Sequence, residues 1–186
     1  MPKNLLPGKW ETDHLKVEDS ALNEVEELQQ IHNSVPQTRG WTDEEGKEQT
    51  KYPIRSALEK GVLPPNGSKE FFRLQSIRKK DTGQLVGFLG VYHGFPRDEV
   101  FWINTITLGP EFQAKGYGPE LITELSNIVG KLQSYRQIRT FVNLKNWPSL
   151  RLCTKIGLNR MVEIVGDKTY SENSDAHVML AKDLAV

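Results

Sequence analysis

Apolar residues recur along this chain with two different periods. From about residue 20 to residue 35 the spacing is helical, and the expected buried face consists of Leu22, Val25, Leu28, Ile31 and Val35. The segment WETDHLKVED before it predicts a short strand, and Ser20 or Asp19 can cap the helix. The acidic residues between the apolar positions are expected to face solvent.

The middle of the chain has the composition of β-strands. The segment FFRLQSIRKKDTGQLVGFLGVYHG contains two apolar runs joined by a Gly-containing turn, which predicts a β-hairpin. The segment DEVFWINTITL that follows is rich in aromatic and β-branched residues and predicts a third strand. Three strands joined by tight turns indicate an antiparallel meander.

Helical and strand patterns alternate in the last third of the chain. A helix is expected with Pro119 in its first turn, and its apolar stripe comprises Leu121, Ile122, Leu125, Ile128, Val129 and Leu132. QIRTFVNL predicts a strand, Asn146 can cap a further helix, and Gly157 can end that helix in a left-handed conformation. LNRMVEIVG and HVMLAKDL predict two final strands, so the order is β-α-(α)-β-β-β-α-β-α-β-β.

Residues 36–70 are polar and rich in turn-forming residues. YPIRSALEKG predicts a short helix that ends at Gly61, and PPNGS predicts a loop. A long polar connection of this kind is either a functional lid or specificity loop or a simple surface excursion.

Composition narrows the class of protein. A chain of 186 residues is expected to form one domain over residues 1–186, and its 24 basic and 24 acidic residues argue against a nucleic-acid partner. The only cysteine is Cys153, the four histidines are widely spaced, and neither a metal site nor a GxSxG hydrolase motif is expected. The sequence has no signal-peptide core and no run long enough to span a membrane, so a cytoplasmic protein without a membrane partner is expected.

The segment QAKGYG, residues 113–118, lies between a predicted strand and a predicted helix. This arrangement is typical of anion sites, because exposed N–H groups at a helix N-terminus and the helix dipole both favour negative charge. Gly116 and Gly118 allow close approach of a ligand to the backbone, and Lys115 adds a positive charge. The P-loop pattern is absent, and a single late GxG does not match the Rossmann fingerprint.

Three segments together resemble the GCN5-related N-acetyltransferase (GNAT) superfamily. LGPEFQAKGYG is similar to the family's acetyl-CoA motif, NLKNWPSLRLCTKIGL resembles its Asn-x-x-Ser helix start, and DTGQLVGFLGVY resembles its hairpin. The resemblance covers nearly the whole chain and is strongest over residues 71–166. It implies an α/β (α+β) domain around a bent, mixed, mostly antiparallel sheet flanked by helices, with splayed central strands.

The resemblance also implies a binding site for acetyl-CoA and no metal. The backbone amides of the glycine-containing segment would hold the diphosphate, the backbone of the preceding strand would pair with the pantetheine arm, and the next helix start would line that arm. The diphosphate group comprises Gln113, Ala114, Lys115, Gly116, Tyr117 and Gly118. The residues that would pair with the arm are Ile106, Thr107 and Leu108, and those that would line it are Asn146 and Ser149. Simple helix capping is an alternative or additional role for the last two residues.

Candidate catalytic residues are less well matched to the family pattern. Cys153 occupies the position where many members carry a tyrosine that protonates the CoA thiolate, although a packing role for Cys153 and protonation by water are alternatives. Glu99 is a candidate base, and Asn104 could orient a water or substrate. A backbone N–H near Leu108 could stabilise the oxyanion. Tyr117 and Tyr170 are possible donors without motif support.

The resemblance therefore implies an acetyl-CoA-dependent N-acetyltransferase, in which a primary amine attacks the thioester directly in a ternary complex. The acceptor is a small-molecule or protein amine, with a slight likeness to the branch that acetylates ribosomal-protein N-termini. Residues 36–70 would shape the acceptor side, with Trp41 and Trp102 as wall residues. A non-catalytic acyl-CoA-binding or sensing domain and a purely structural domain are the alternatives, and a monomer or homodimer is expected.

Overall fold

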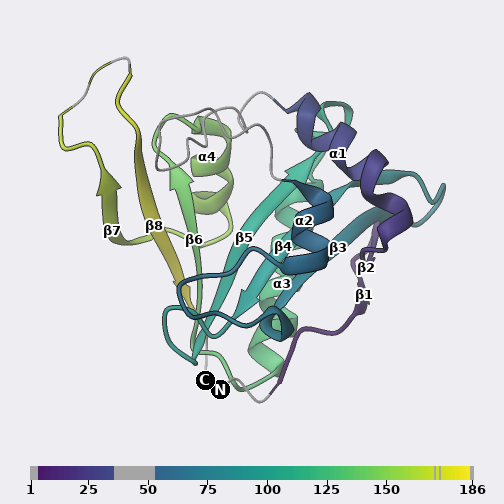
Figure 1. Cartoon of the computed structure of the whole chain (residues 1–186), viewed down its shortest axis with the longest axis horizontal. Helices are drawn as coiled ribbons and strands as arrows, with labels where there is room; N and C mark the ends of the chain where they lie inside the picture. Colours follow the sequence, from purple (N-terminus) through teal and green to yellow (C-terminus); the bar gives the residue numbers. More distant parts are fainter. Residues whose placement is uncertain (1–3, 36–52, 170, 172, 185–186) are drawn as a thin grey trace.

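The computed structural model describes residues 4–35, 53–169, 171 and 173–184. Its strands form one sheet of eight strands in the order β1-β2-β3-β4-β5-β6-β8-β7 (Figure 1). Among these described strands only β5 and β6 pair in parallel. The strands are β1 (Lys9–Glu11), β2 (Leu15–Asp19), β3 (Phe72–Lys79), β4 (Leu85–His93), β5 (Val100–Leu108), β6 (Gln137–Asn143), β7 (Arg160–Gly166) and β8 (Ala176–Asp183). The expected mixed, mostly antiparallel sheet is confirmed.

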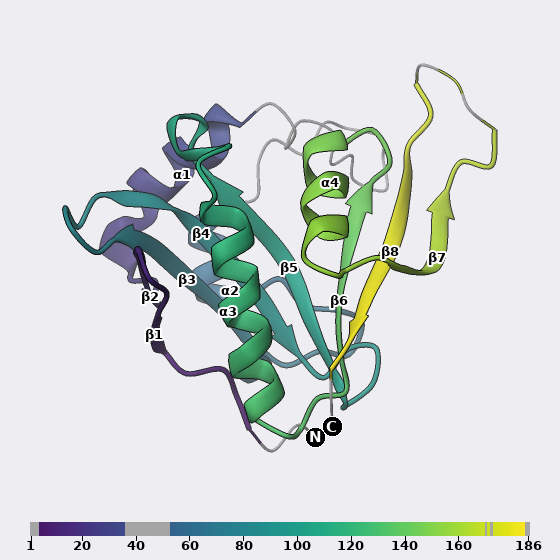
Figure 2. The same ribbon diagram turned by 180° about the vertical axis from the view of Figure 1, so that it is seen from behind.

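Helices cover both faces of this sheet. They are α1 (Val25–Ser34), α2 (Ile54–Lys60), α3 (Tyr117–Lys131) and α4 (Trp147–Lys155). Helices α1 and α2 lie on the face turned to the viewer in Figure 1, and α3 and α4 lie on the opposite face, seen in Figure 2. Each face has its own apolar cluster, with Leu28 and Ile54 in the first and Leu121 and Leu125 in the second.

The central meander follows the sequence pattern. Strands β3, β4 and β5 pair antiparallel, and all nine residues of β4 are buried because helices cover both of its faces. The stripe on α3 also packs as expected, with four of its residues buried and Ile128 and Leu132 partly buried against the same cluster. Helix α2 ends before Gly61, whose φ of 79° suits a residue without a side chain.

The N-terminal segment differs from the expectation in two respects. It contains two strands, β1 and β2, rather than one. Neither Ser20 nor Asp19 caps the first helix, because the Ser20 hydroxyl lies 2.8 Å from that of Ser76 and Asp19 binds Arg73 and Gln75. A short 3-10 turn therefore precedes α1, and Leu22 in that turn is 55% exposed rather than buried.

The parallel pair at the centre of the sheet parts along its length. Strands β5 and β6 pair only from Val100 and Gln137 to Ile103 and Thr140. Beyond this point β5 stays paired with β4 and β6 stays paired with β8, so the two strands diverge (Figure 2). The expected splayed central strands are confirmed.

Candidate functional site

The parted strands leave one edge of β5 without a strand partner. The divergence begins at a β-bulge, since Gly90 is opposite Thr105 and Val91 is opposite Ile103, so that Asn104 is the additional residue. From Asn104 to Leu108 the edge of β5 that faces away from β4 has none of the described strands beside it. An extended ligand chain can therefore pair with this edge.

Backbone alternation decides which residues of β5 face this open edge. The Gly109 N–H donates to Val86 O of β4, and a Cβ on Gly87 would lie 2.0 Å from the Thr107 carbonyl oxygen. The Thr107 backbone therefore faces β4, and the backbones of Ile106 and Leu108 face the opening. Of the three residues expected to pair with a pantetheine arm, only Ile106 and Leu108 present backbone groups to it.

The segment from Gln113 to Gly118 connects this strand with α3. The Gln113 side chain donates from Nε2 to Leu108 O at 2.9 Å, which holds the segment against the end of β5. Ala114 and Gly116 have φ values of 58° and 89°, and Gly116 is the N-cap of α3. A Cβ on Gly116 would meet no atom within 4 Å, so open space lies in front of it.

Backbone amides of this segment lack acceptors. Within the described chain, no hydrogen bond is made by the N–H groups of Ala114, Lys115, Gly116, Tyr117 or Gly118. Glu120 is the first residue whose N–H bonds within the helix turn, to Gly116 O at 3.1 Å. Five successive unbonded amides at a helix N-terminus form a site with the chemistry for an anion.

Helix α4 packs beside the start of α3. A Cβ on Gly118 would lie 3.4 Å from Leu152 Cδ2, so Leu152 packs directly against this glycine. The start of α4 is capped as expected, because Asn146 Oδ1 accepts a hydrogen bond from the Ser149 N–H at 3.2 Å. Asn146 and Ser149 are both partly exposed.

Cys153 lies in the apolar cluster under α4 and is only 7% exposed. Burial raises the pKa of its thiol to about 11. Such a thiol is a weaker acid than an ordinary one and donates its proton poorly to a thiolate. Its surroundings favour the packing role over proton donation.

Glu99 lies at the paired end of β5, away from the opening. Its main-chain oxygen accepts from the Arg136 N–H at 2.8 Å, and its carboxylate lies 3.2 Å from Arg97 Nε. The bulge at Asn104 is five positions further along the chain, about 17 Å along an extended strand. The structure therefore does not bring Glu99 to the site, whereas partly exposed Asn104 stands where the strands part.

Aromatic side chains line the face of β5 and β6 that α1 and α2 cover. Trp102 is buried, and its ring packs edge-on against Phe95 and Phe141 at centroid distances of 5.4 and 5.2 Å. Phe141, which is 40% exposed, forms the accessible part of this wall and was missed in the sequence. The alternating pattern of QIRTFVN could have revealed Phe141. Ile138 and Val142 point into the core on one face of the strand, so Phe141 must point to the opposite face. Trp41 and Tyr170 lie outside the described residues.

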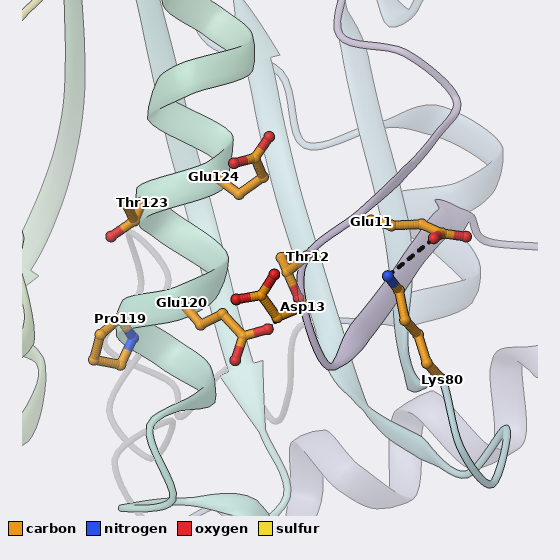
Figure 3. Close-up of a pocket in the computed structure, with 8 residues that line it drawn as sticks. All are labelled: Glu11, Thr12, Asp13, Lys80, Pro119, Glu120, Thr123 and Glu124. Carbon is orange, nitrogen blue, oxygen red and sulfur yellow. Dashed lines mark hydrogen bonds and ion pairs between the residues drawn. The ribbon is translucent and has the colours of Figure 1, made fainter.

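A pocket of about 500 Å³ lies on another side of α3, against the β1–β2 turn (Figure 3). Four of its eight lining residues are acidic and one is basic, and none is an expected binding residue; the lining comprises Glu11, Thr12, Asp13, Lys80, Pro119, Glu120, Thr123 and Glu124. Burial raises the pKa of Glu120, but hydrogen bonds from Thr12 and His14 outweigh this and keep the pKa below its ordinary value. The negative charge disfavours a phosphate ligand in this pocket.

The described residues lack two further kinds of feature. They contain no group of three His, Cys, Asp or Glu side chains arranged to hold a metal ion. Nor does any helix among them have the length and apolar character required to cross a bilayer.

Comparison with known proteins identifies the family. Residues 18–159, well over half of the chain, match the family model described as acetyltransferase (GNAT) domain. The chain belongs to the GNAT family. The GNAT fold accounts for the parted strands and for the glycine-containing segment that follows one of them. A search of curated proteins gave no significant match.

Solved GNAT structures resemble this chain in fold at low sequence identity. The ribosomal-protein-S18-alanine N-acetyltransferase from Escherichia coli is 11% identical with a TM-score of 0.67, over 92% of this chain and 95% of that one. A Bacillus subtilis acetyltransferase in complex with CoA is 16% identical with a TM-score of 0.61, over 92% and 98%. A chimera of Vibrio cholerae spermidine N-acetyltransferase is 11% identical with a TM-score of 0.64, over 91% and 95%. At these identities the likeness concerns the fold alone.

Proposed function

We propose that this protein transfers the acetyl group of acetyl-CoA to a primary amine, by direct attack in a ternary complex. The observation that carries the proposal is the run of unbonded amides from Ala114 to Gly118, set at the N-terminus of α3 beside the parted strands. Family membership supplies the reaction class, and the amides supply a site for the charged part of the donor.

The residues present fit the diphosphate of acetyl-CoA. The open space in front of Gly116 allows a phosphate to approach the amides, and the helix dipole stabilises its charge. Lys115 is exposed, with its Nζ 6.0 Å from the centre of the Phe112 ring, so it is free to turn toward an anion. Gln113 would contribute by holding the segment against β5 rather than through its backbone amide, because its N–H already donates to Pro110 O at 3.3 Å.

The open edge of β5 suits the pantetheine arm. Ile106 and Leu108 would pair with the amide groups of the arm, as a neighbouring strand does. The Leu108 carbonyl already accepts from Gln113, so its N–H is the group left for the ligand. Asn146 and Ser149 at the start of α4 would line the other side.

Transfer forms a nitrogen–carbon bond to the acceptor and breaks the carbon–sulfur bond of the thioester. The amine must lose a proton, and the departing thiolate must gain one. With Glu99 at the far end of β5 and Cys153 buried, we assign both proton transfers to water, oriented on the amine side by Asn104. A β5 backbone N–H that faces the opening and is not paired with the arm would stabilise the oxyanion.

The acceptor is proposed to enter from the face that carries Phe141. The partly exposed ring offers an apolar surface beside the opening. The solved neighbours are named for a protein amine and for a small polyamine, so both acceptor classes are proposed.

A non-catalytic acyl-CoA-binding domain is the second candidate. It is favoured by the buried thiol at the position of the family's acidic tyrosine and by the distance of Glu99 from the opening. A screen for thiol release over small amines, polyamines and peptide N-termini separates the two functions. Release with at least one amine supports the enzyme, whereas tight acetyl-CoA binding without any release supports the binding domain.

The site itself is tested by Gly116→Glu. The new carboxylate enters the space reserved for phosphate, and acetyl-CoA affinity measured by calorimetry is expected to fall at least about tenfold, equivalent to about 1.4 kcal/mol. Gly83→Glu is the matched control, because Gly83 also has a positive φ (71°) and open space around it but lies in the β3–β4 turn. Equal affinities in the two variants would show that the diphosphate binds elsewhere.

A further inference from the structure

Helix α4 carries an exposed stripe of one aromatic and two basic side chains. Trp147, Arg151 and Lys155 are spaced four residues apart, so they follow one another along the same face of the helix. All three are exposed, and Trp147, at 66%, is the most exposed large apolar side chain in the described part of the chain. The opposite face packs into the core through Cys153 and Ile156.

The two cations of this stripe are not used within the fold. Arg151 and Lys155 make no ion pair or side-chain hydrogen bond with any residue that the structure describes. Helix α4 contains no acidic residue between Trp147 and Lys155. By contrast, Arg73, Arg78 and Arg160 each pair with a carboxylate. Arg151 and Lys155 are therefore available to an external anion.

The stripe lies next to the phosphate-binding segment. Leu152 meets Gly118 in the first turn of α3, and Arg151 immediately precedes Leu152, so Arg151 is level with the unbonded amides. Helices α3 and α4 follow parallel strands and run in the same direction on one face of the sheet (Figure 2). Trp147 lies about one turn, roughly 6 Å, beyond Arg151 toward the open end.

We propose that this stripe binds the nucleotide end of acetyl-CoA, an inference that rests on the proposed function. The nucleotide leaves the diphosphate on the side away from the arm, and it carries an adenine ring and a phosphate on its ribose. Trp147 stacks on the adenine, and Arg151, supported by Lys155, binds the ribose phosphate. An aromatic plate with adjacent unpaired cations is the chemistry that recognises a phosphorylated nucleotide.

Three ligands separate the contributions of these residues. CoA carries all the groups, dephospho-CoA lacks the ribose phosphate, and 4′-phosphopantetheine lacks the whole nucleotide. Affinities measured by calorimetry are compared for the parent protein, Arg151→Gln and Trp147→Ala. Arg136→Gln is the control for loss of an exposed cation, because Arg136 lies beyond the far end of α3. Melting temperatures verify that each variant is folded.

Each variant has a distinct expected pattern. Arg151→Gln weakens CoA binding about tenfold and leaves dephospho-CoA binding nearly unchanged. Trp147→Ala weakens both nucleotides about fivefold to tenfold and leaves 4′-phosphopantetheine unchanged. The quenching of tryptophan fluorescence by CoA is lost with Trp147→Ala. Arg136→Gln binds all three ligands like the parent.

Failure of this inference is distinguishable from failure of the proposed function. If the parent binds CoA but Arg151→Gln still distinguishes it from dephospho-CoA, or Trp147→Ala loses no affinity, the assignment to α4 is wrong and the proposed function stands. If the parent binds none of the three ligands, the proposed function is wrong and this inference fails with it.

Discussion

At the scale of single residues, His93 ties the N-terminal segment to the sheet. It is 1% exposed, its Nε2 accepts from the Leu6 N–H at 2.9 Å, and its Nδ1–H donates to Phe71 O at 2.7 Å. The bond from Leu6 requires the neutral ring, because a protonated Nε2 has no lone pair left to accept it. Burial is the main reason that the pKa of His93 falls to about 4.

This histidine predicts a pH dependence of stability. The folded-state pKa lies below the ordinary value of 6.5, so the unfolded chain takes up the proton first, and stability is lost as the pH falls from 6.5 toward 4. Between pH 7 and pH 5 the expected contribution is about 2 kcal/mol of unfolding free energy. Urea unfolding at both pH values measures it. His93→Gln, which keeps one donor and one acceptor, should lose that part of the slope, and an unchanged slope would contradict the assignment.

Cys153 gives a prediction about chemistry. Because its thiol is buried and its pKa is raised to about 11, it should react slowly with thiol reagents at pH 8 in the folded protein. Cys153→Ala should change the turnover number by less than about twofold, since water is proposed to reprotonate the thiolate. If the turnover number of a folded Cys153→Ala variant fell by more than about a hundredfold, Cys153 would be the proton donor after all.

Residue roles were only partly predictable from the sequence. The left-handed conformation of Gly157 and the cap at Asn146 follow from local chemistry, and both were expected. That Thr107 turns its backbone to β4 depends on strand register, which is fixed by pairing with a distant segment. The exposure of Leu22 likewise follows from a 3-10 turn that helical periodicity does not reveal.

At the scale of elements, α4 combines a structural and a binding role. The Asn146 cap satisfies the Ser149 N–H, one of the orphan donors of the first turn. Asn146→Ala should therefore lower the unfolding free energy by about 1 kcal/mol, whereas Asn146→Asp keeps an acceptor and should be nearly neutral. Chemical denaturation of both variants measures this, and equal losses would show that the cap contributes nothing.

Element type was readable where periodicity was strong. The stripe of α3, the alternation in β6 and the buried run of β4 each carry one clear pattern, and each element formed as expected. The first helix was harder, because Ser20 and Asp19 prefer partners on β3 that are more than 50 residues away. Tertiary contacts of this kind override local capping preferences.

At the scale of the whole molecule, function depends on one topological feature. The crossover β5–α3–β6 makes the central pair parallel, while antiparallel partners on either side draw the two strands apart beyond Ile103 and Thr140. The resemblance implied this parting, but its starting point at Asn104 required the register. The register also shows that Glu99 lies at the paired end of β5, away from the opening. The sequence alone did not reveal this, because it does not show where along β5 the strands part.

The central claim is that the amides from Ala114 to Gly118 bind the diphosphate of acetyl-CoA. A crystal structure of the protein with CoA tests it most directly, through the distances from the diphosphate oxygens to these amide nitrogens. We expect distances of about 2.7–3.2 Å to at least two of the amides, with the arm along Ile106 and Leu108. A diphosphate bound away from α3, or an arm outside the opening between β5 and β6, would contradict the account.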